Sequence, residues 1–272
     1  MTADGRIGAA FARAAAEGRA AFVAYLTAGD PDRRATVDLA RAVEAGGADV
    51  LELGVPFSDP IADGPTLQRA AARALAAGTP LESVFAAASE IRRRTALPLL
   101  LFSYANPLAA RGFDRAFRDA SAAGFDAVLL TDVPVEESNL VLPEIRRAAL
   151  DPVFLVSPTS GAARMRAAAA RSRGFLYVVS RTGTTGEKGR LADDLEKTVA
   201  RARRAASTRS GGPAGPLPIA VGFGIASADD ARRVAAIADG VVVGSALVAQ
   251  AERTGARGVE DLTRRLAGAC RR

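Results

Sequence analysis

The sequence predicts an α/β protein with the architecture of a (β/α)8 barrel, and three observations support this. Eight short runs rich in Val, Leu, Ile and Phe recur along the 272 residues, and Ala- and Arg-rich segments of helical character separate them. Strands that alternate with helices indicate parallel βαβ units. Eight such units in a chain of about 250 residues favour a closed barrel over an open doubly wound sheet.

The elements can be placed along the chain from these patterns. The residues before Arg19 predict an extra N-terminal helix, with Ile7 and Phe11 on its apolar side, that would cap the N-terminal end of the barrel. Helical patterns include residues 33–45, 113–122, 162–172 and 228–236. The expected strands are residues 21–27, 49–53, 97–103, 126–131, 152–157, 175–180, 217–222 and 239–244.

Two features concern the connections between these elements. The phrases AGGADV and AAGFDAV share one junction, in which a helix ends at Gly and an Asp, Asp49 or Asp126, opens the next strand. Residues 207–218 are rich in Gly, Pro and Ser, which is typical of a surface loop, and we expect this loop on the face far from the active site. Because the alternation resumes directly after it, we interpret residues 1–272 as a single domain.

Composition limits the class of protein. The chain has no run of 18 apolar residues and no continuous apolar stretch near its start, so we expect neither a membrane span nor a signal peptide. The single Cys270 excludes an internal disulfide and fits a reducing, cytoplasmic location. The net charge of +6 comes mostly from Arg spread along helical stretches, and Trp is absent, so we do not expect a nucleic-acid surface.

The chain contains no histidine, which excludes a Ser-His-Asp triad, a His-zinc site and imidazole acid–base chemistry. Proton transfer must then fall to Asp, Glu, Tyr, Lys or Cys. The stretch LELGVPFSDPIADGPT, residues 51–66, holds two candidates. Glu52 lies between two leucines in an expected strand and so faces the opposite side, where a lone carboxylate is costly unless it is paired or used. Asp63 follows in a turn-forming loop.

Simpler interpretations of both carboxylates stay open. Glu52 could be the buried ion-pair partner of an Arg, and Asp63 could form an Asx turn or cap the helix that starts near Pro65.

Functional sites in this fold lie at the C-terminal ends of the strands. Tyr177 lies in the sixth expected strand and leads into SRTGTTG, a segment that could close over a ligand, although Tyr177 could equally be a core aromatic. Asp132 we interpret as structural, binding backbone in its DVP turn. The ends of the last two strands could bind a phosphate through backbone N–H groups, although such glycines often only form turns. The residues concerned are Gly222, Gly224, Gly244 and Ser245.

Several phrases in a fixed order resemble the tryptophan synthase α subunit family: ELGVPFSDPIADGPT, YANP, DVPVEES, YVVSRTGTTG, GFGI and GSA. The resemblance runs from about Ala21 to Ala249, and its first phrase is the most specific. It implies a TIM barrel that cleaves indole-3-glycerol phosphate to indole and glyceraldehyde 3-phosphate in tryptophan biosynthesis. It also implies a β subunit as partner in an α2β2 complex, with pyridoxal phosphate held by that partner and no cofactor or metal in this chain.

The resemblance also assigns residues. It implies that Glu52 is the acid–base group, that Asp63 lies near the indole nitrogen, and that Asp59 and Pro60 face the β subunit. The family often has Phe at the position of Tyr25, so this chain keeps the aromatic face and adds a hydroxyl. The other implied substrate-binding residues are Tyr177 in the pocket, Thr185 and Gly186 in the lid, and Phe223, Gly224, Gly244 and Ser245 around the phosphate.

The reaction suits these residue types. Indole C3 must be protonated, the adjacent hydroxyl must lose its proton, and the charge on the ring must be stabilised. A carboxyl group whose pKa is raised by an apolar surround can serve the first two needs, and an ionised carboxylate the third. Two alternatives remain: a stand-alone indole-3-glycerol-phosphate lyase, and a non-catalytic barrel that activates its β subunit, against which the intact Glu52 and Asp63 argue.

Overall fold

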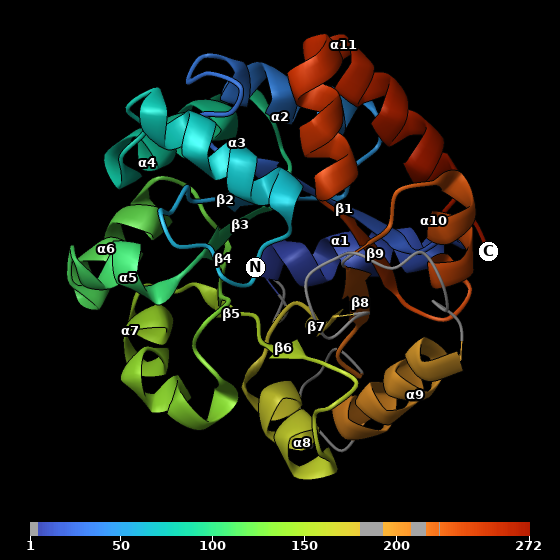
Figure 1. Ribbon diagram of the computed structural model, residues 1–272. Helices are drawn as coiled ribbons and strands as arrows, with labels where there is room; N and C mark the ends of the chain where they lie inside the picture. The colour runs from blue at the N-terminus through green and yellow to red at the C-terminus, as the bar shows by residue number, and fades with distance from the viewer. Residues whose placement is uncertain (1–4, 180–192, 208–215, 223) are drawn as a thin grey trace.

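The computed structural model describes residues 5–179, 193–207, 216–222 and 224–272, and in these ranges nine parallel strands form one curled sheet (Figure 1). The strands pair in the order β5-β4-β3-β2-β1-β9-β8-β7-β6. Their bounds are β1 Ala21–Thr27, β2 Val50–Gly54, β3 Leu99–Ser103, β4 Ala127–Leu130, β5 Asp151–Pro152, β6 Leu155–Val156, β7 Leu176–Val179, β8 Ile219–Gly222 and β9 Gly240–Val243.

The two edge strands of this order, β5 and β6, are successive pieces of the fifth expected strand. β5 pairs with β4, and β6 pairs with β7. Between the pieces, the Val153 N–H donates to Val128 O at 2.9 Å, and Phe154 O accepts from the Tyr177 N–H at 3.1 Å. One segment therefore joins both edges of the sheet, and the ring of eight barrel strands closes. The predicted (β/α)8 barrel is confirmed.

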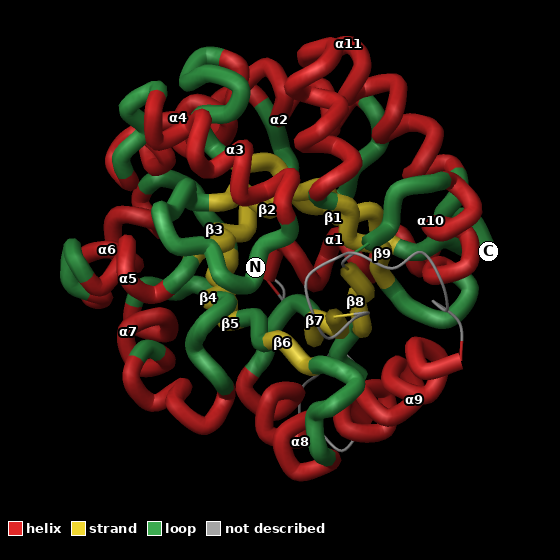
Figure 2. The backbone as a smooth tube through the Cα atoms, in the orientation of Figure 1, coloured by secondary structure: helices red, strands yellow, loops and turns green. Residues whose placement is uncertain are grey.

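Helices surround the ring of strands, as Figure 2 shows. No helix in the described ranges is long and apolar enough to span a bilayer. The helices are α1 Gly5–Ala16, α2 Ala35–Ala45, α3 Pro65–Ala76, α4 Leu81–Arg94, α5 Ala105–Ala109, α6 Phe113–Ala122, the 3-10 helix η1 Val135–Leu140, α7 Leu142–Arg147, α8 Ala162–Arg171, α9 Asp193–Ser207, α10 Ala228–Ala235 and α11 Ser245–Gly268.

The strands are buried on both faces, which explains why they are nearly continuous apolar runs in the sequence. All seven residues of β1 are buried, and alternate residues belong to two different clusters. Phe22 and Leu26 pack outward in the layer between strands and helices. Val23 and Tyr25 lie in the cluster inside the barrel. The inner cluster continues toward the pocket described below.

Helix α1 closes the N-terminal end of the barrel, as expected from its apolar side. Ile7 is fully buried, and the Phe11 ring stacks on Phe175, which precedes β7, with ring centroids 5.3 Å apart. Gly240, the first residue of β9, lies so close that a Cβ there would come within 2.7 Å of the Phe11 ring. The predicted extra N-terminal helix is thus present and seals the barrel.

Three aspartates at this same end accept hydrogen bonds in one repeated arrangement. Asp49, just before β2, accepts the Phe22 N–H at 2.8 Å and the Arg19 guanidinium at 2.8 Å. Each carboxylate links two neighbouring strands and neutralises the charge of an arginine. The repeated sequence junctions at Asp49 and Asp126 are therefore structural. The other two sets are Asp126 with the Leu99 N–H and Arg92, and Asp239 with the Ile219 N–H and Arg203.

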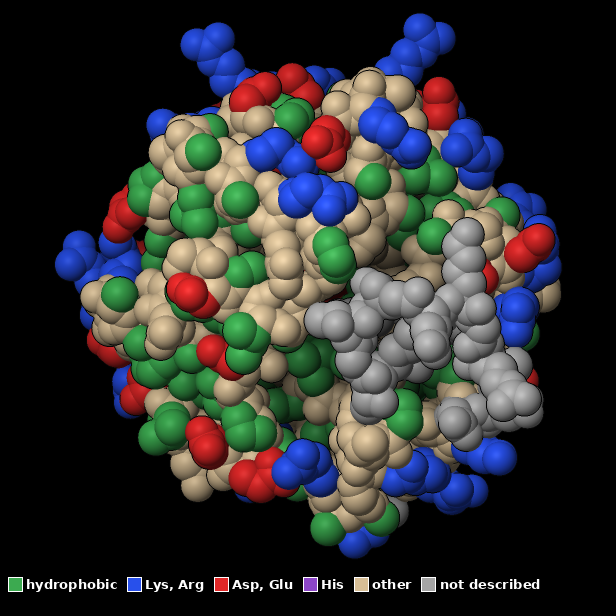
Figure 3. Space-filling view, in the orientation of Figure 1, with side chains coloured by type: hydrophobic (Ala, Val, Ile, Leu, Met, Phe, Trp, Pro, Cys, Tyr) green, Lys and Arg blue, Asp and Glu red, His purple; other side chains and the backbone are tan. Residues whose placement is uncertain are grey.

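Several surface arginines pair with carboxylates on the same helix. Arg118 binds Asp114 one turn away at 2.7 Å, and Arg94 binds Glu90 in the same spacing at 2.6 Å. On the face shown in Figure 3, Lys and Arg side chains lie mostly toward the edge and are interspersed with Asp and Glu. The Arg-rich composition therefore corresponds to helix surfaces with mixed charge.

Candidate active site

A pocket opens at the C-terminal ends of the strands, and the structure brings seven of the predicted site residues together there. The other three predicted site residues, Thr185, Gly186 and Phe223, lie outside the described residues. The pocket is lined by Tyr25, Glu52, Asp63, Leu67, Phe102, Tyr177, Gly224, Ile225, Val242, Gly244 and Ser245.

The sequence did not single out the apolar part of this lining: Leu67, Phe102, Ile225 and Val242. A signal existed for Phe102, because it follows Leu100 by two residues on the same strand face, and both belong to the inner cluster. Leu67 and Ile225 lie beyond strand ends, where alternation gives no guidance.

Glu52 faces the barrel interior from β2. Its register partners are Tyr25 on β1 and Leu100 on β3. The side chain is 1% exposed, and neither carboxyl oxygen has a hydrogen-bond partner within the described structure. Burial raises the pKa of Glu52 to about 8. The interpretation of Glu52 as an ion-pair partner of an Arg is therefore wrong.

Asp63 is presented by the loop that follows β2. Its N–H donates to Pro60 O at 3.1 Å, and the Gln68 side-chain amide donates to its backbone oxygen at 3.0 Å. Burial raises the pKa of Asp63 to about 6, and a hydrogen bond from Tyr104 works against that shift. The interpretation of Asp63 as a helix cap is wrong, because α3 is preceded by Gly64 and has no side-chain cap.

Two phenol hydroxyls flank the pocket, and each lies over a glycine at the end of a strand. The hydroxyl of Tyr25 lies over Gly54, and the hydroxyl of Tyr177 lies over Gly222; a Cβ at either glycine would be 2.1 Å from the phenol oxygen. Glycine is required at both positions for this close approach. Burial raises the pKa of both tyrosines above the usual range, so both stay neutral and able to donate.

The part of the pocket lining at the start of α11 suits an anion. Helix α11 starts at Ser245 after Gly244, and no side chain caps its N-terminus. Helix α10, by contrast, is closed by a capping box between Ser227 and Asp230. Within the described residues, the first N–H groups of α11 therefore have no side-chain cap beside the pocket, and a helix N-terminus of this kind is suited to bind an anion. Gly224 lines the same region with a φ of +85°, which a side chain would strain.

Asp132 binds backbone, as predicted, but within the described residues its contact is with another segment and not with its own DVP turn. Its carboxylate accepts the Ala105 N–H at 2.8 Å, at the start of α5, and it does not line the pocket. It therefore fixes the segment that carries Tyr104.

Apolar residues are exposed beside the pocket, on the loop that holds Asp59 and Pro60. Ile61 is 79% exposed, and it shares a shallow hollow with Phe57 and Leu75. Exposed apolar side chains in such a cluster are typical of a protein interface.

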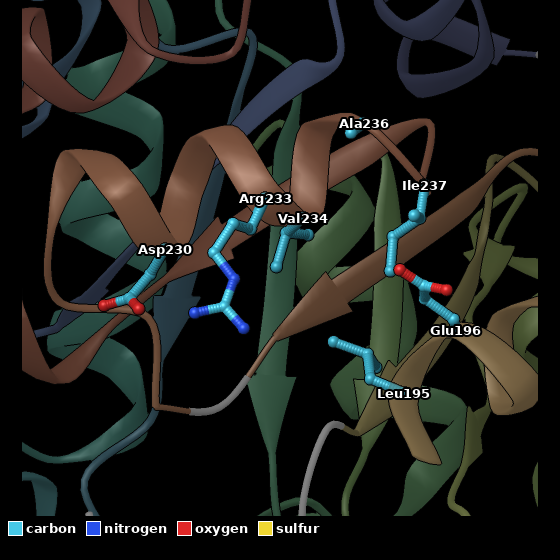
Figure 4. A pocket seen from close by; sticks show the side chains of 7 residues that line it. All are labelled: Leu195, Glu196, Asp230, Arg233, Val234, Ala236 and Ile237. Atoms are coloured by element: carbon cyan, nitrogen blue, oxygen red, sulfur yellow. The ribbon is translucent and has the colours of Figure 1, made fainter. Parts of the chain in front are cut away.

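A further hollow lies outside the barrel, between α9 and α10 (Figure 4). Asp230 already caps α10 there, and Leu195 and Val234 belong to the outer core. Among the described residues, this hollow contains no buried carboxyl oxygen without a hydrogen-bond partner, whereas the pocket with Glu52 and Asp63 does.

Comparisons with known proteins agree with this geometry. The family model described as "Tryptophan synthase alpha chain" matches residues 11–271. The tryptophan synthase alpha chains of Geotalea daltonii and Geobacter sulfurreducens are 45% and 46% identical, over 92% and 91% of this chain and 91% and 90% of theirs.

Solved structures give the same result. A structure of Mycobacterium tuberculosis tryptophan synthase superposes with a TM-score of 0.89 at 34% identity, covering 99% of both chains. Tryptophan synthase subunit alpha of Legionella pneumophila superposes with a TM-score of 0.84 at 33% identity, covering 98% of both chains.

Proposed function

Because the chain belongs to the tryptophan synthase alpha chain family, we propose that the pocket described above is its active site, with Glu52 and Asp63 as the catalytic residues. The enzyme is a carbon–carbon lyase that cleaves indole-3-glycerol phosphate to indole and glyceraldehyde 3-phosphate. The observation that carries the assignment is the pair of buried carboxyl groups with unpartnered oxygens in one pocket. We further propose that residues 1–272 act as a single barrel domain.

Glu52 serves as the acid and then as the base. With a pKa of about 8 it is protonated at neutral pH, so it can transfer its proton to indole C3. The resulting carboxylate then accepts the proton of the hydroxyl on the adjacent side-chain carbon. The electrons of that O–H bond form the aldehyde C=O, and the C–C bond breaks toward the ring to release neutral indole. Glu52 ends the cycle protonated, as it began.

Asp63 acts through its charge. With a pKa of about 6 it is mostly ionised at neutral pH, whereas Glu52 is not. Protonation at C3 places a positive charge on the ring that extends to the nitrogen. A carboxylate that accepts the ring N–H stabilises this charge, and its effect is strong because Asp63 is buried. Environments that separate the pKa values of two carboxyl groups thus give them different roles.

The phosphate of the substrate would bind at the N-terminus of α11. The uncapped N–H groups, Gly244, Ser245 and the positive-φ Gly224 support this assignment. We place the indole ring among the aromatic residues Tyr25, Phe102 and Tyr177 of the same pocket. This orientation brings the reacting bond between the two ends, beside Glu52.

We also propose that the exposed loop with Asp59, Pro60 and Ile61 docks a β subunit in an α2β2 complex. Members of this family work with that subunit, which holds pyridoxal phosphate. The cluster of exposed apolar side chains beside the pocket mouth supports the docking face, because indole would have a short path to the partner.

An assay of the purified chain on indole-3-glycerol phosphate, with and without its β subunit, tests the proposal. We expect indole release in both states and a higher turnover when size-exclusion chromatography shows a complex. High turnover that the β subunit does not change would favour a stand-alone lyase. No turnover in either state would favour a non-catalytic activator.

A further inference from the structure

Tyr104 is buried against the loop that carries Asp63, although it does not line the pocket. Its side chain is 4% exposed. Its hydroxyl oxygen accepts the N–H of Ala62, the residue before Asp63, at 2.9 Å. The same hydroxyl lies near the Asp63 carboxyl group, where its donor lowers the pKa of Asp63 against the effect of burial. One phenol therefore contacts both the backbone and the side chain of this part of the loop.

The Tyr104 backbone is fixed on both sides. The Ser103 hydroxyl donates to Tyr104 O at 2.8 Å, and the next N–H, that of Ala105, donates to Asp132 at 2.8 Å. The loop after β2 is less constrained, since Ala62 and Ile61 are exposed. The ring of Phe57, from the start of this loop, lies on Tyr104 with centroids 5.2 Å apart. Tyr104 is thus a rigid anchor for a surface loop.

We propose that Tyr104 is the positioning residue of Asp63: it holds the carboxylate toward the substrate and links it to the exposed loop at Phe57 and Ile61. This inference rests on the proposed function. The hydroxyl donates to the charged form of Asp63, so it favours ionisation. Movement of the loop would change both the direction and the charge of Asp63. Glu52, Tyr25 and Tyr177 are the other titratable groups in the same pocket, and none of them is carried by this loop.

The substitution Tyr104→Phe tests the proposal in the full-length chain. It keeps the ring and its contact with Phe57, and it removes the hydroxyl. We expect kcat for indole-3-glycerol phosphate to fall about tenfold with little change in KM, since a charge-assisted hydrogen bond is lost. We also expect the acid limb of the pH–rate profile to move to higher pH, because Asp63 loses a donor to its ionised form. An acid limb in the parent's position would overturn the proposal.

A matched control removes a hydroxyl elsewhere. Thr95→Val deletes a buried hydroxyl that lacks a partner, next to the end of α4, and should change neither kcat nor the pH profile. If the parent itself shows no acid limb, the proposed role of Asp63 fails rather than that of Tyr104.

A second measurement separates positioning from a general structural role. In an Asp63→Asn background, the residual kcat is measured with and without Tyr104→Phe. If Tyr104 acts through the Asp63 carboxylate, the second substitution changes this residual kcat less than twofold, against about tenfold in the parent. An equal, about tenfold loss of kcat in both backgrounds would mean that Tyr104 only supports the fold, and the proposal would be wrong.

Discussion

Four carboxyl groups in the described part of this barrel are almost fully buried, yet two of them are paired with arginines and two are not. Asp30 and Asp49 are each 2% exposed, Glu52 is 1% exposed and Asp63 is 6% exposed. Arg73 contacts both oxygens of Asp30 at 2.7 and 3.1 Å, and Arg19 does the same for Asp49. Among the described residues, neither carboxyl oxygen of Glu52 has a hydrogen-bond partner, and one oxygen of Asp63 has none.

A cationic partner, and not the degree of burial, therefore separates a structural carboxylate from a reactive one. A paired carboxylate joins elements of the fold through its arginine. An unpaired one has its pKa raised and can exchange protons near neutral pH. Both kinds lie on one scaffold, with Asp49 at the closed end of the barrel and Glu52 at the open end.

The largest expected effect is that of Glu52→Gln on catalysis. The amide has the shape of the protonated acid but no proton to exchange, so we expect kcat to fall by about 10³-fold or more while the fold is kept. Steady-state release of indole measures this loss, and circular dichroism checks the fold. Near-normal cleavage by this variant would remove Glu52 from the mechanism.

Asp63→Asn should follow, with a loss of about 10²- to 10³-fold in kcat, because a neutral amide cannot stabilise the charged ring. The matched control is Asp30→Asn, which alters a buried carboxylate with an arginine partner and should leave kcat within about twofold while lowering stability. If both variants lost activity equally, the distinction between paired and unpaired carboxyl groups would fail.

Asp49→Ala tests the structural kind. It leaves Arg19 without its main partner and the buried Phe22 N–H without an acceptor, so we expect the free energy of unfolding to fall by about 3 kcal/mol. Urea denaturation measures this change, and kcat of the folded enzyme should not change. Glu17→Ala is the control, because Glu17 binds the same arginine but is 51% exposed, and it should cost less than about 1 kcal/mol.

Stability should also depend on pH in a way that identifies Glu52. Its pKa rises from 4.5 in the unfolded chain to about 8 in the fold, so between these values the native state binds a proton that the unfolded state has lost. Stability from this group is therefore full below pH 4.5 and falls as pH rises, by at most about 1.4 kcal/mol per pH unit. Glu52→Gln should gain stability over the parent between pH 6 and 8. Parallel pH curves for the two proteins would contradict the raised pKa.

Much of the fold could be predicted from the sequence, because strands that are buried on both faces are nearly continuous apolar runs. The run 21–27 coincides with β1, and Ile7 and Phe11 identified the sealing helix. The break between β5 and β6 was not predicted. Pro152 has no N–H to donate, and a single apolar run gives no sign of which residues pair on each side.

The site was predictable where chemistry constrains residue type, and not where packing does. The absence of histidine directed attention to Glu52, and alternation placed it inside the barrel. The pairing of Asp49 with Arg19 could not be predicted, because 30 residues separate them and only the closed barrel brings them together. Local sequence therefore left the ion-pair interpretation of Glu52 open until its surroundings were known.

The smallest expected effect concerns Tyr25, where the family often has Phe. Within the described residues, its hydroxyl accepts one long hydrogen bond, from Thr27 at 3.4 Å, so Tyr25→Phe should reduce kcat/KM by about threefold or less. Gly54→Ala provides the comparison, because its Cβ would lie 2.1 Å from the hydroxyl and 2.6 Å from Cζ and would displace the ring with or without the hydroxyl. We expect this second variant to lose more activity. If Tyr25→Phe lost as much activity as Gly54→Ala, the hydroxyl and not the aromatic face would matter to the reaction. The Tyr25 hydroxyl would then join the two carboxyl groups as a neutral hydrogen-bond donor in catalysis.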